Sequence, residues 1–347
     1  MPRRTTPARV MIVEDSAVVR RLLTHIVAGD PRLTVAAAVA SAEEAIAAIP
    51  SVRPDVISMD IRLPGIDGLE ATRRIMADHP TPIVVISASI DRGELGNSMD
   101  ALRAGALSVV EKPVGLADAA YVQVAAEIRT QLAIMSEVAV VRRRMREPAL
   151  SPPVMPPRTR APRVLLVAAS TGGPPALARL FAALPADFPL PILLVQHMGA
   201  GFMQGFANWL GSVVPQQVEL ARHGDLPRPG TIHVAPGDSH LTIGRAGTMT
   251  VSTDPPVGGQ RPSATRLIES GATALDGAAL AIVLTGMGDD GGAGVQTLLA
   301  AGGSAVAEDA TTAVVYGMPA AAQRAGALSL PLGMIGPHVR RIVERRA

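Results

Sequence analysis

The segment Arg163–Gly173, RVLLVAASTGG, decides the fold of the second half of the chain. Its apolar run predicts a buried strand, and Pro174 and Pro175 mark the start of a helix. Ser170, in the turn between them, would lie above the sheet edge, beside the free N–H groups of a helix start. Such a serine suits a nucleophile, whose oxyanion needs N–H donors, or a turn that binds phosphate. The segment alone leaves both possibilities open.

Length and composition predict two α/β domains. The 347 residues are 48% hydrophobic and only 2% aromatic, which fits helices packed on strands of small and β-branched residues. The absence of cysteine excludes disulfides, thiolate-bound metals and cysteine nucleophiles. No apolar run is long enough to span a membrane, and a net charge of +2 gives no basis for nucleic-acid binding. We expect a cytoplasmic monomer with no membrane insertion and no nucleic-acid partner.

Alternating strand and helix patterns fill the first 120 or so residues. The expected strands are residues 9–14, 33–40, 56–59, 83–87 and 107–110. Five successive βα units predict a doubly wound parallel sheet. In such a sheet, ligands bind at the carboxyl ends of the strands.

Polar side chains stand at those carboxyl ends, namely Glu14, Asp15, Asp60, Ser87 and Lys112. Three carboxylates at adjoining strand ends are unfavourable unless a cation joins them, and Mg²⁺ prefers one or two carboxylates plus waters. Lys112 is the only lysine among 32 basic residues, and a compact ammonium fits a confined anionic site. Any one of these residues could be an ordinary loop residue. Together they predict a site for Mg²⁺ and a phosphoryl group.

Four segments of this half resemble the receiver domain of bacterial response regulators, which has a flavodoxin-like fold. They are VMIVEDSAVVRRLL, PDVISMDIRLPGIDGLEATRRI, PIVVISAS and GALSVVEKP. The resemblance implies that Asp60 is the phospho-acceptor and that Glu14, Asp15 and Asp60 hold Mg²⁺. It also implies that Ser87 and Lys112 contact the phosphoryl group.

A helix and a proline-rich segment follow. Apolar residues recur at helical spacing between Leu116 and Met135, and residues 147–162 contain six prolines among several arginines. The predicted domains are a receiver over residues 1–130, a helical extension and Pro/Arg-rich linker over 131–162, and a second domain over 163–347. The basic linker is either a solvated segment or a docking site for an acidic partner.

The second domain repeats the alternation. Strands are expected within residues 163–169, 191–196, 217–220, 232–235, 279–285 and 305–307, with a hairpin over 240–252. Helices are expected at residues 176–184, 202–210, 264–275, 295–300 and 339–344. These elements predict a second doubly wound parallel sheet, of the Rossmann-like class.

Three expected strands of this domain end in reactive residues: Ser170, His197 and the pair Asp289-Asp290. Because parallel strands end at one edge, an imidazole there could take the serine proton while a carboxylate orients the ring.

Alternatives remain open at this point. His197 could be a core histidine, His233 or His240 could be the base, and the glycine-rich turn could bind phosphate or metal. The G-x-G-x-x-G, P-loop and G-x-S-x-G patterns are absent, which disfavours the common nucleotide folds and the α/β-hydrolases.

Five further segments resemble the chemotaxis protein-glutamate methylesterases, the CheB family. They are AASTGG, VQHM, IHVAPGDSH, PPVGGQRPSATRL and LTGMGDDGGAG. The resemblance implies Ser170 as nucleophile, His197 as general base and acid, Asp290 as orienting carboxylate and the Met287 N–H as oxyanion donor. It implies phosphorylation-activated hydrolysis of glutamate γ-methyl esters on chemoreceptors, which releases methanol, and glutamine deamidation by the same site. A chemotaxis histidine kinase would donate the phosphoryl group, and the catalytic domain would need no cofactor.

Three positions depart from the two family patterns. Val109 stands where receivers often have an aromatic residue, Gly199 where a proline is usual, and Thr265 where an aspartate is usual. Thr265 is expected in a loop that borders the site. Two other functions are considered: a response regulator whose second domain only binds a partner, and an enzyme that binds a nucleotide at the 170–175 turn.

Overall fold

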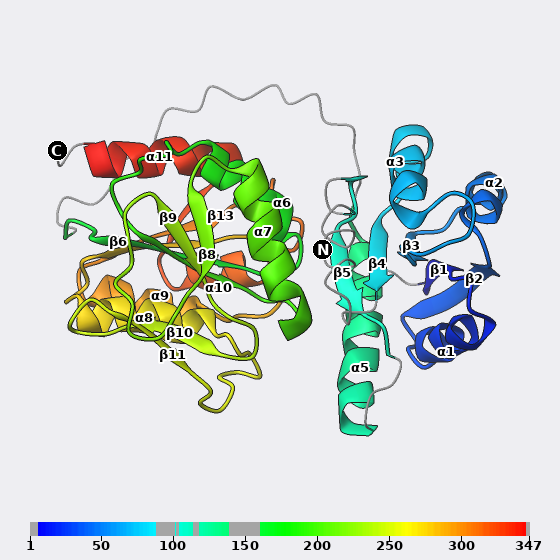
Figure 1. The fold of residues 1–347 in the computed structure, drawn as a ribbon, viewed down its shortest axis with the longest axis horizontal. Coiled ribbons are helices and arrows are strands. Elements are labelled where there is room, and N and C mark those ends of the chain that lie inside the picture. The colour runs from blue at the N-terminus through cyan, green and yellow to red at the C-terminus, as the bar shows by residue number, and fades with distance from the viewer. Residues whose placement is uncertain (1–5, 88–100, 102–103, 114–117, 139–159, 345–347) are drawn as a thin grey trace. The chain divides into compact units, whose positions relative to one another are not determined.

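The computed structural model describes residues 6–87, 101, 104–113, 118–138 and 160–344 (Figure 1). The chain divides into two compact units, Met1–Arg144 and Met145–Ala347. The division falls within the predicted 131–162 connection, most of which lies outside the described residues. None of the described helices has both the length and the apolar character needed to cross a lipid bilayer.

The first unit is a five-stranded parallel sheet in the order β2-β1-β3-β4-β5, which confirms the doubly wound prediction. Helices α1 and α5 pack together, and α2 packs with α3 (Figure 1). The elements are β1 (Ala8–Val13), α1 (Ala17–Ala28), β2 (Leu33–Val39), α2 (Ala42–Val52), β3 (Val56–Met59), α3 (Gly68–Asp78), β4 (Ile83–Ser87), β5 (Ser108–Glu111) and α5 (Asp118–Met135).

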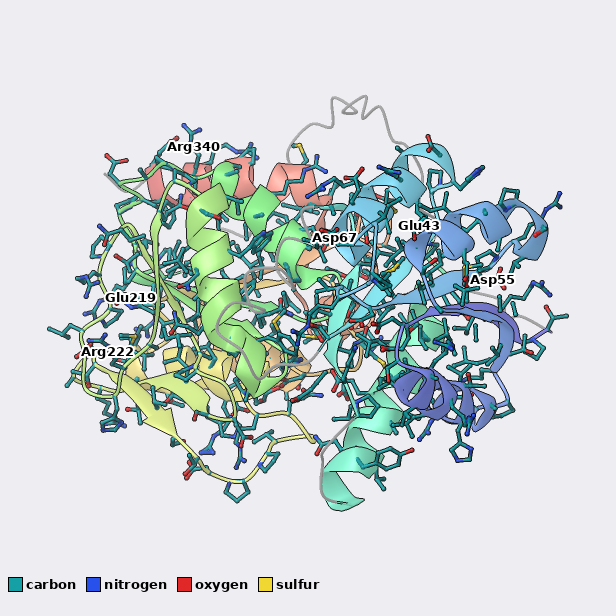
Figure 2. The ribbon with its side chains drawn as sticks, turned by 45° about the vertical axis from the view of Figure 1, so that its right-hand side comes forward. Glu43, Asp55, Asp67, Glu219, Arg222 and Arg340 are labelled. Atoms are coloured by element: carbon teal, nitrogen blue, oxygen red, sulfur yellow. The ribbon has the colours of Figure 1, made fainter. Side chains whose placement is uncertain are left out.

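Local sequence explains these boundaries. The side chains of Ser16, Ser41 and Asp67 cap α1, α2 and α3 by accepting N–H groups of the first turns. Of these three residues, Asp67 is labelled in Figure 2. In α5, Leu132 and Met135 are fully buried, as expected from the apolar spacing between Leu116 and Met135.

The second unit is a seven-stranded parallel sheet in the order β14-β13-β12-β6-β7-β9-β8, beside the predicted antiparallel hairpin β10–β11. Helices α8, α9 and α10 form one packed group and α6, α7 and α11 another (Figure 1). The strands are β6 (Val164–Ala169), β7 (Ile192–Gln196), β8 (Gln217–Leu220), β9 (Thr231–Val234), β10 (His240–Ile243), β11 (Met249–Ser252), β12 (Ala279–Val283), β13 (Ser304–Glu308) and β14 (Leu328–Leu330). The helices are α6 (Gly173–Ala182), η1 (Ala200–Phe202), α7 (Met203–Val213), α8 (Ala264–Ala274), α9 (Gly292–Ala300), α10 (Met318–Arg324) and α11 (Leu332–Glu344).

Several elements differ from the prediction. Strand β14 and helix α10 were not predicted, and α11 starts seven residues earlier than expected and contains Pro337. Val122, expected within the apolar stripe of α5, is 61% exposed. The sheet itself is as expected: β6 is fully buried because helices cover both faces of a parallel sheet.

Candidate active site and phosphorylation site

The turn after β6 holds Ser170 in a fixed position. Its N–H donates to the Thr285 carbonyl at 3.0 Å, and its carbonyl accepts from the Gly173 N–H at 2.8 Å. Gly172 precedes α6 with a φ of +75°, and a Cβ there would lie 2.7 Å from Val314 Cβ. The turn therefore requires glycine both for its backbone conformation and for its close packing.

His197 follows β7, the strand next to β6, and its N–H donates to the Ala169 carbonyl at 3.0 Å. Its Nε2 lies 3.0 Å from Asp290 Oδ2. No hydrogen bond joins the Ser170 hydroxyl to this ring within the described part of the chain. Catalytic serine–histidine bonds are often long until substrate binds, so this geometry is compatible with a triad.

The Asp290 carboxylate lies at the N-terminus of α8. Oδ1 accepts from the Ser263 hydroxyl at 2.9 Å and the Thr265 N–H at 2.9 Å, and Oδ2 accepts from the Ala264 N–H at 2.7 Å. We call Ser263, Ala264 and Thr265 the carboxylate cradle. Burial raises the pKa of Asp290. The hydrogen bond and charge of His197 and the cradle N–H groups lower it by more, so that the pKa is about 2.

This charge assigns the histidine tautomer. Because Asp290 is ionised at neutral pH and can only accept, Nε2 of His197 carries the proton that it donates. The lone pair then lies on Nδ1. In the serine protease triad, Nδ1 of the histidine faces the carboxylate and Nε2 faces the serine. In His197 it is Nε2 that faces the carboxylate.

The structure separates the candidates that the sequence left open. Asp289 is exposed, whereas Asp290 is buried against His197. His233 on β9 accepts the Arg228 N–H at 3.0 Å and lies 3.0 Å from Glu219, a residue of β8 labelled in Figure 2. Its ring is therefore occupied away from the serine.

His240 is also fully buried, and its Nδ1 accepts from the Ser263 N–H at 3.2 Å. Its Nε2 lies 3.1 Å from the Pro255 carbonyl, which fixes Nε2 as the protonated nitrogen. Both nitrogens of the His240 ring thus have hydrogen-bond partners other than Ser170, and the ring supports the carboxylate cradle.

Met287 lies on the glycine-rich turn after β12, with its side chain 48% exposed. The preceding Gly286 approaches the serine so closely that a Cβ there would lie 2.8 Å from Ser170 Cβ. The backbone at residues 286–287 therefore borders the nucleophile candidate, which is where an oxyanion donor must lie.

The cradle was missed by the sequence reasoning. Thr265 lies in the first turn of α8, with 9% of its surface exposed, which confirms the expected helix over 264–275 and contradicts the expectation of a loop at this residue. Its Oγ1 accepts the Gly291 N–H at 2.8 Å, so it holds the turn that carries Asp290. The sequence did carry one signal for the cradle: Ser263 can cap a helix, and a helix start has backbone N–H groups that are free to bind a carboxylate.

The first unit gathers its predicted acidic residues at the ends of β1 and β3. Ligand atoms of Glu14, Asp15 and Asp60 lie within 4.8 Å of one another. The Lys112 ammonium lies 2.7 Å from Asp60 Oδ2 and 3.0 Å from Glu14 Oε2. Ser87, at the end of β4, is buried, and its carbonyl accepts the Lys112 N–H at 2.9 Å.

At this cluster the ammonium of Lys112 offsets the repulsion between the carboxylates of Glu14 and Asp60. Burial and the charge of Asp60 raise the pKa of Glu14. Burial lowers the pKa of Lys112, but the hydrogen bond and charge of Asp60 and the charge of Glu14 raise it overall. Three carboxylates whose oxygens lie this close together fit Mg²⁺, which prefers oxygen ligands.

Comparison with known proteins agrees with both units. Residues 10–120 match the family described as response regulator receiver domain, and residues 165–339 match CheB methylesterase. A Paramagnetospirillum magneticum protein named protein-glutamate methylesterase/protein-glutamine glutaminase 2 is 48% identical over 341 residues, which cover 96% of each chain. An Anaeromyxobacter dehalogenans protein, number 3 of the same name, is 46% identical, with 92% of this chain and 93% of the relative covered.

A solved structure also matches. The crystal structure of the Thermotoga maritima CheB methylesterase catalytic domain is 32% identical and superposes with a TM-score of 0.50. The match covers 53% of this chain and 99% of that chain. The resemblance noted in the motifs is thus confirmed over nearly the whole sequence. The chain belongs to the CheB methylesterase family, with a response regulator receiver domain in its first half.

Proposed function

We propose that the protein hydrolyses glutamate γ-methyl esters on methyl-accepting chemoreceptors and deamidates receptor glutamines at the same site. Its relatives carry the corresponding names, protein-glutamate methylesterase/protein-glutamine glutaminase. The observation that carries the proposal is the 3.0 Å contact of His197 with the cradled Asp290, at the strand end next to Ser170. A serine, an imidazole and an ionised carboxylate in this order suit acyl transfer.

In the mechanism, Nδ1 of His197 takes the Ser170 proton as Oγ attacks the ester carbonyl. The tetrahedral oxyanion is stabilised by the Met287 N–H. His197 then returns the proton to the leaving oxygen, and methanol departs. A water molecule, deprotonated by the same ring, hydrolyses the acyl-serine and leaves a glutamate. With a glutamine substrate, ammonia leaves in place of methanol. Asp290 keeps its charge throughout and stabilises the imidazolium.

The decisive experiment measures methanol release from methylated receptor. Ser170→Ala is expected to reduce release to background, because alanine has no hydroxyl to attack the ester carbonyl. Asp289→Asn, at the exposed neighbour of Asp290, is the matched control and is expected to keep wild-type activity. Undiminished release from Ser170→Ala would refute the esterase assignment.

The first unit would control this activity. We infer that Asp60 accepts a phosphoryl group from a chemotaxis histidine kinase, with Mg²⁺ held by Glu14, Asp15 and Asp60. Bound Mg²⁺ would neutralise charge on the transferring phosphoryl group. Ser87 and Lys112 would then contact the phosphorylated side chain. The cluster geometry supports this assignment.

Phosphorylation is expected to raise the rate of ester hydrolysis in a cytoplasmic, monomeric protein. Asp60→Asn should abolish the response to a small phosphoryl donor while leaving the basal rate intact. A phosphoryl donor that stimulates the Asp60→Asn variant as strongly as the wild type would contradict the role of Asp60. Sedimentation at working concentration tests the monomer.

A further inference from the structure

Glu308, the last residue of β13, is fully buried although no proposed chemical step uses it. Its Oε2 accepts the Thr285 N–H at 2.9 Å. Its Oε1 is buried and has no hydrogen-bond partner among the described residues. A buried carboxyl with one unsatisfied oxygen is costly, so the contact that it does make needs an explanation.

Thr285 is the point where three segments of the site meet. Its carbonyl accepts the Ser170 N–H at 3.0 Å, and its Oγ1 donates to the Thr171 carbonyl at 2.9 Å. The Val315 N–H donates to the same Oγ1 at 2.9 Å. Thr285 therefore holds the turn that carries Ser170 through two hydrogen bonds. It directly precedes Gly286 and Met287, whose N–H is the proposed oxyanion donor.

Glu308 takes over where the sheet ladder ends. Parallel pairing of β12 with β13 stops at Val283 and Ala307. One residue on, the Leu284 N–H donates to the Ala168 carbonyl on the other neighbouring strand, β6. The next N–H, that of Thr285, finds its acceptor in the Glu308 side chain. Without this carboxyl, a buried N–H group would lose its partner at the base of the site.

The charge state of Glu308 indicates which substitution preserves the contact. Burial raises the pKa of this carboxyl to about 7, and the charge of Asp309 acts in the same direction. The Thr285 N–H, the nearby Thr312 hydroxyl and the charge of Arg179, on α6, act in the opposite direction. A glutamine has the shape of the neutral acid and keeps an acceptor oxygen, whereas a leucine keeps only the volume.

We propose that Glu308 is a positioning residue, which acts through Thr285 to fix Ser170 relative to the Met287 N–H. The proposal rests on the esterase function stated above. It makes Glu308 important for the chemical step and unimportant for substrate binding, because Glu308 is buried beneath the turn and cannot touch a receptor.

The test compares steady-state methanol release by Glu308→Leu and Glu308→Gln. The leucine variant is expected to lose about 10-fold or more in kcat, with KM changed less than about 2-fold, because only the transition-state geometry suffers. The glutamine variant is expected to keep kcat within about 3-fold of wild type, since the acceptor remains. Gln216→Leu is the matched control: it removes a buried side chain that binds the carbonyls of Phe181, Leu184 and Pro185, and should leave kcat unchanged.

Each outcome decides a different question. A wild-type protein that releases no methanol would overturn the esterase function itself. A folded Glu308→Leu protein with wild-type kcat would overturn only the positioning role. So would a folded variant whose KM rises by as large a factor as its kcat falls. If the leucine variant does not fold, Glu308→Gln still decides: a drop in kcat of more than about 10-fold there contradicts the proposal.

Discussion

The two strand-end sites neutralise buried carboxylates in opposite ways. In the first unit, Glu14 and Asp60 share the ammonium of Lys112, a flexible side chain that reaches in from β5. In the second unit, Asp290 is surrounded by two backbone N–H groups and one hydroxyl at the start of α8, and by the imidazole that follows β7. A side-chain ammonium can shift when Mg²⁺ and a phosphoryl group bind, as proposed above, whereas fixed dipoles favour one charge state. The proposed control site and the proposed active site thus differ in their electrostatics although they stand on similar sheets.

Glu308 lies between these two cases. Its Oε2 accepts one backbone N–H, and burial raises its pKa to about 7. Asp290, with three donors and His197, has a pKa of about 2. Burial raises the pKa of both carboxyls, and at Asp290 the hydrogen bond and charge of His197, together with the cradle N–H groups, outweigh it. The following changes test this comparison, starting with the largest expected effect.

Removing the charge of Asp290 should affect activity most. In Asp290→Asn the cradle N–H groups face an amide, and His197 loses the acceptor that sets its tautomer. We expect kcat for methanol release to fall on the order of 10³- to 10⁴-fold, as for the equivalent change in the serine protease triad. Activity within 10-fold of wild type would show that the carboxylate charge is dispensable.

Removing the movable cation should destabilise the first unit. Lys112→Met leaves Glu14 and Asp60 as like charges without a partner, which should cost about 3 kcal/mol of local stability. Hydrogen exchange of the β1 and β3 amides measures this loss. Added Mg²⁺ should restore more protection to this variant than to the wild type. The exposed pair Arg74–Glu70 supplies the control, because Arg74→Gln should change nothing measurable.

The pKa of Glu308 predicts a pH-dependent stability. Because its folded value of about 7 exceeds the ordinary 4.5, the folded state binds a proton more tightly. The resulting stabilisation is complete below pH 4.5 and is lost as the pH rises to about 7 and above. Unfolding of the second unit, followed by the fluorescence of Trp209, should show Glu308→Gln gaining about 3 kcal/mol over wild type across this range. A pH-independent difference would mean that Glu308 does not titrate there.

The smallest effect is expected at the edge of the cradle. Thr265→Val removes the acceptor of the Gly291 N–H and should cost about 1 kcal/mol of stability, with a few-fold loss of kcat. Thr265→Ser keeps the hydroxyl and should resemble the wild type in both measurements. Equal behaviour of the two variants would contradict a role for the hydrogen bond, and a larger loss in Thr265→Ser would assign the effect to packing of the γ-methyl group.

Much of the fold could be predicted from local patterns. Apolar strands followed by polar residues placed Glu14, Asp60, Ser170 and His197 at strand ends, and parallel pairing made each set converge. The short strand β14 and helix α10 were missed because their alanine- and leucine-rich sequences carry no clear period.

What local patterns could not provide were contacts between distant segments. The choice of Asp290 over Asp289 depends on the cradle, which lies some 25 positions earlier in the chain. No role was predicted for Glu308, because its partner Thr285 lies just beyond the end of the neighbouring strand β12. Tertiary partners decide such roles, and a single sequence does not display them.

The carboxylate cradle has a consequence for anyone who would transplant this chemistry to another scaffold. Grafting only the side chains of Ser170, His197 and Asp290 would not suffice, since the carboxyl of Asp290 would lack the N–H groups of the helix start that help to keep it ionised. The smallest portable unit is the aspartate together with the first turn of α8 and the capping Ser263. A design must therefore include these backbone N–H groups as part of the catalytic site.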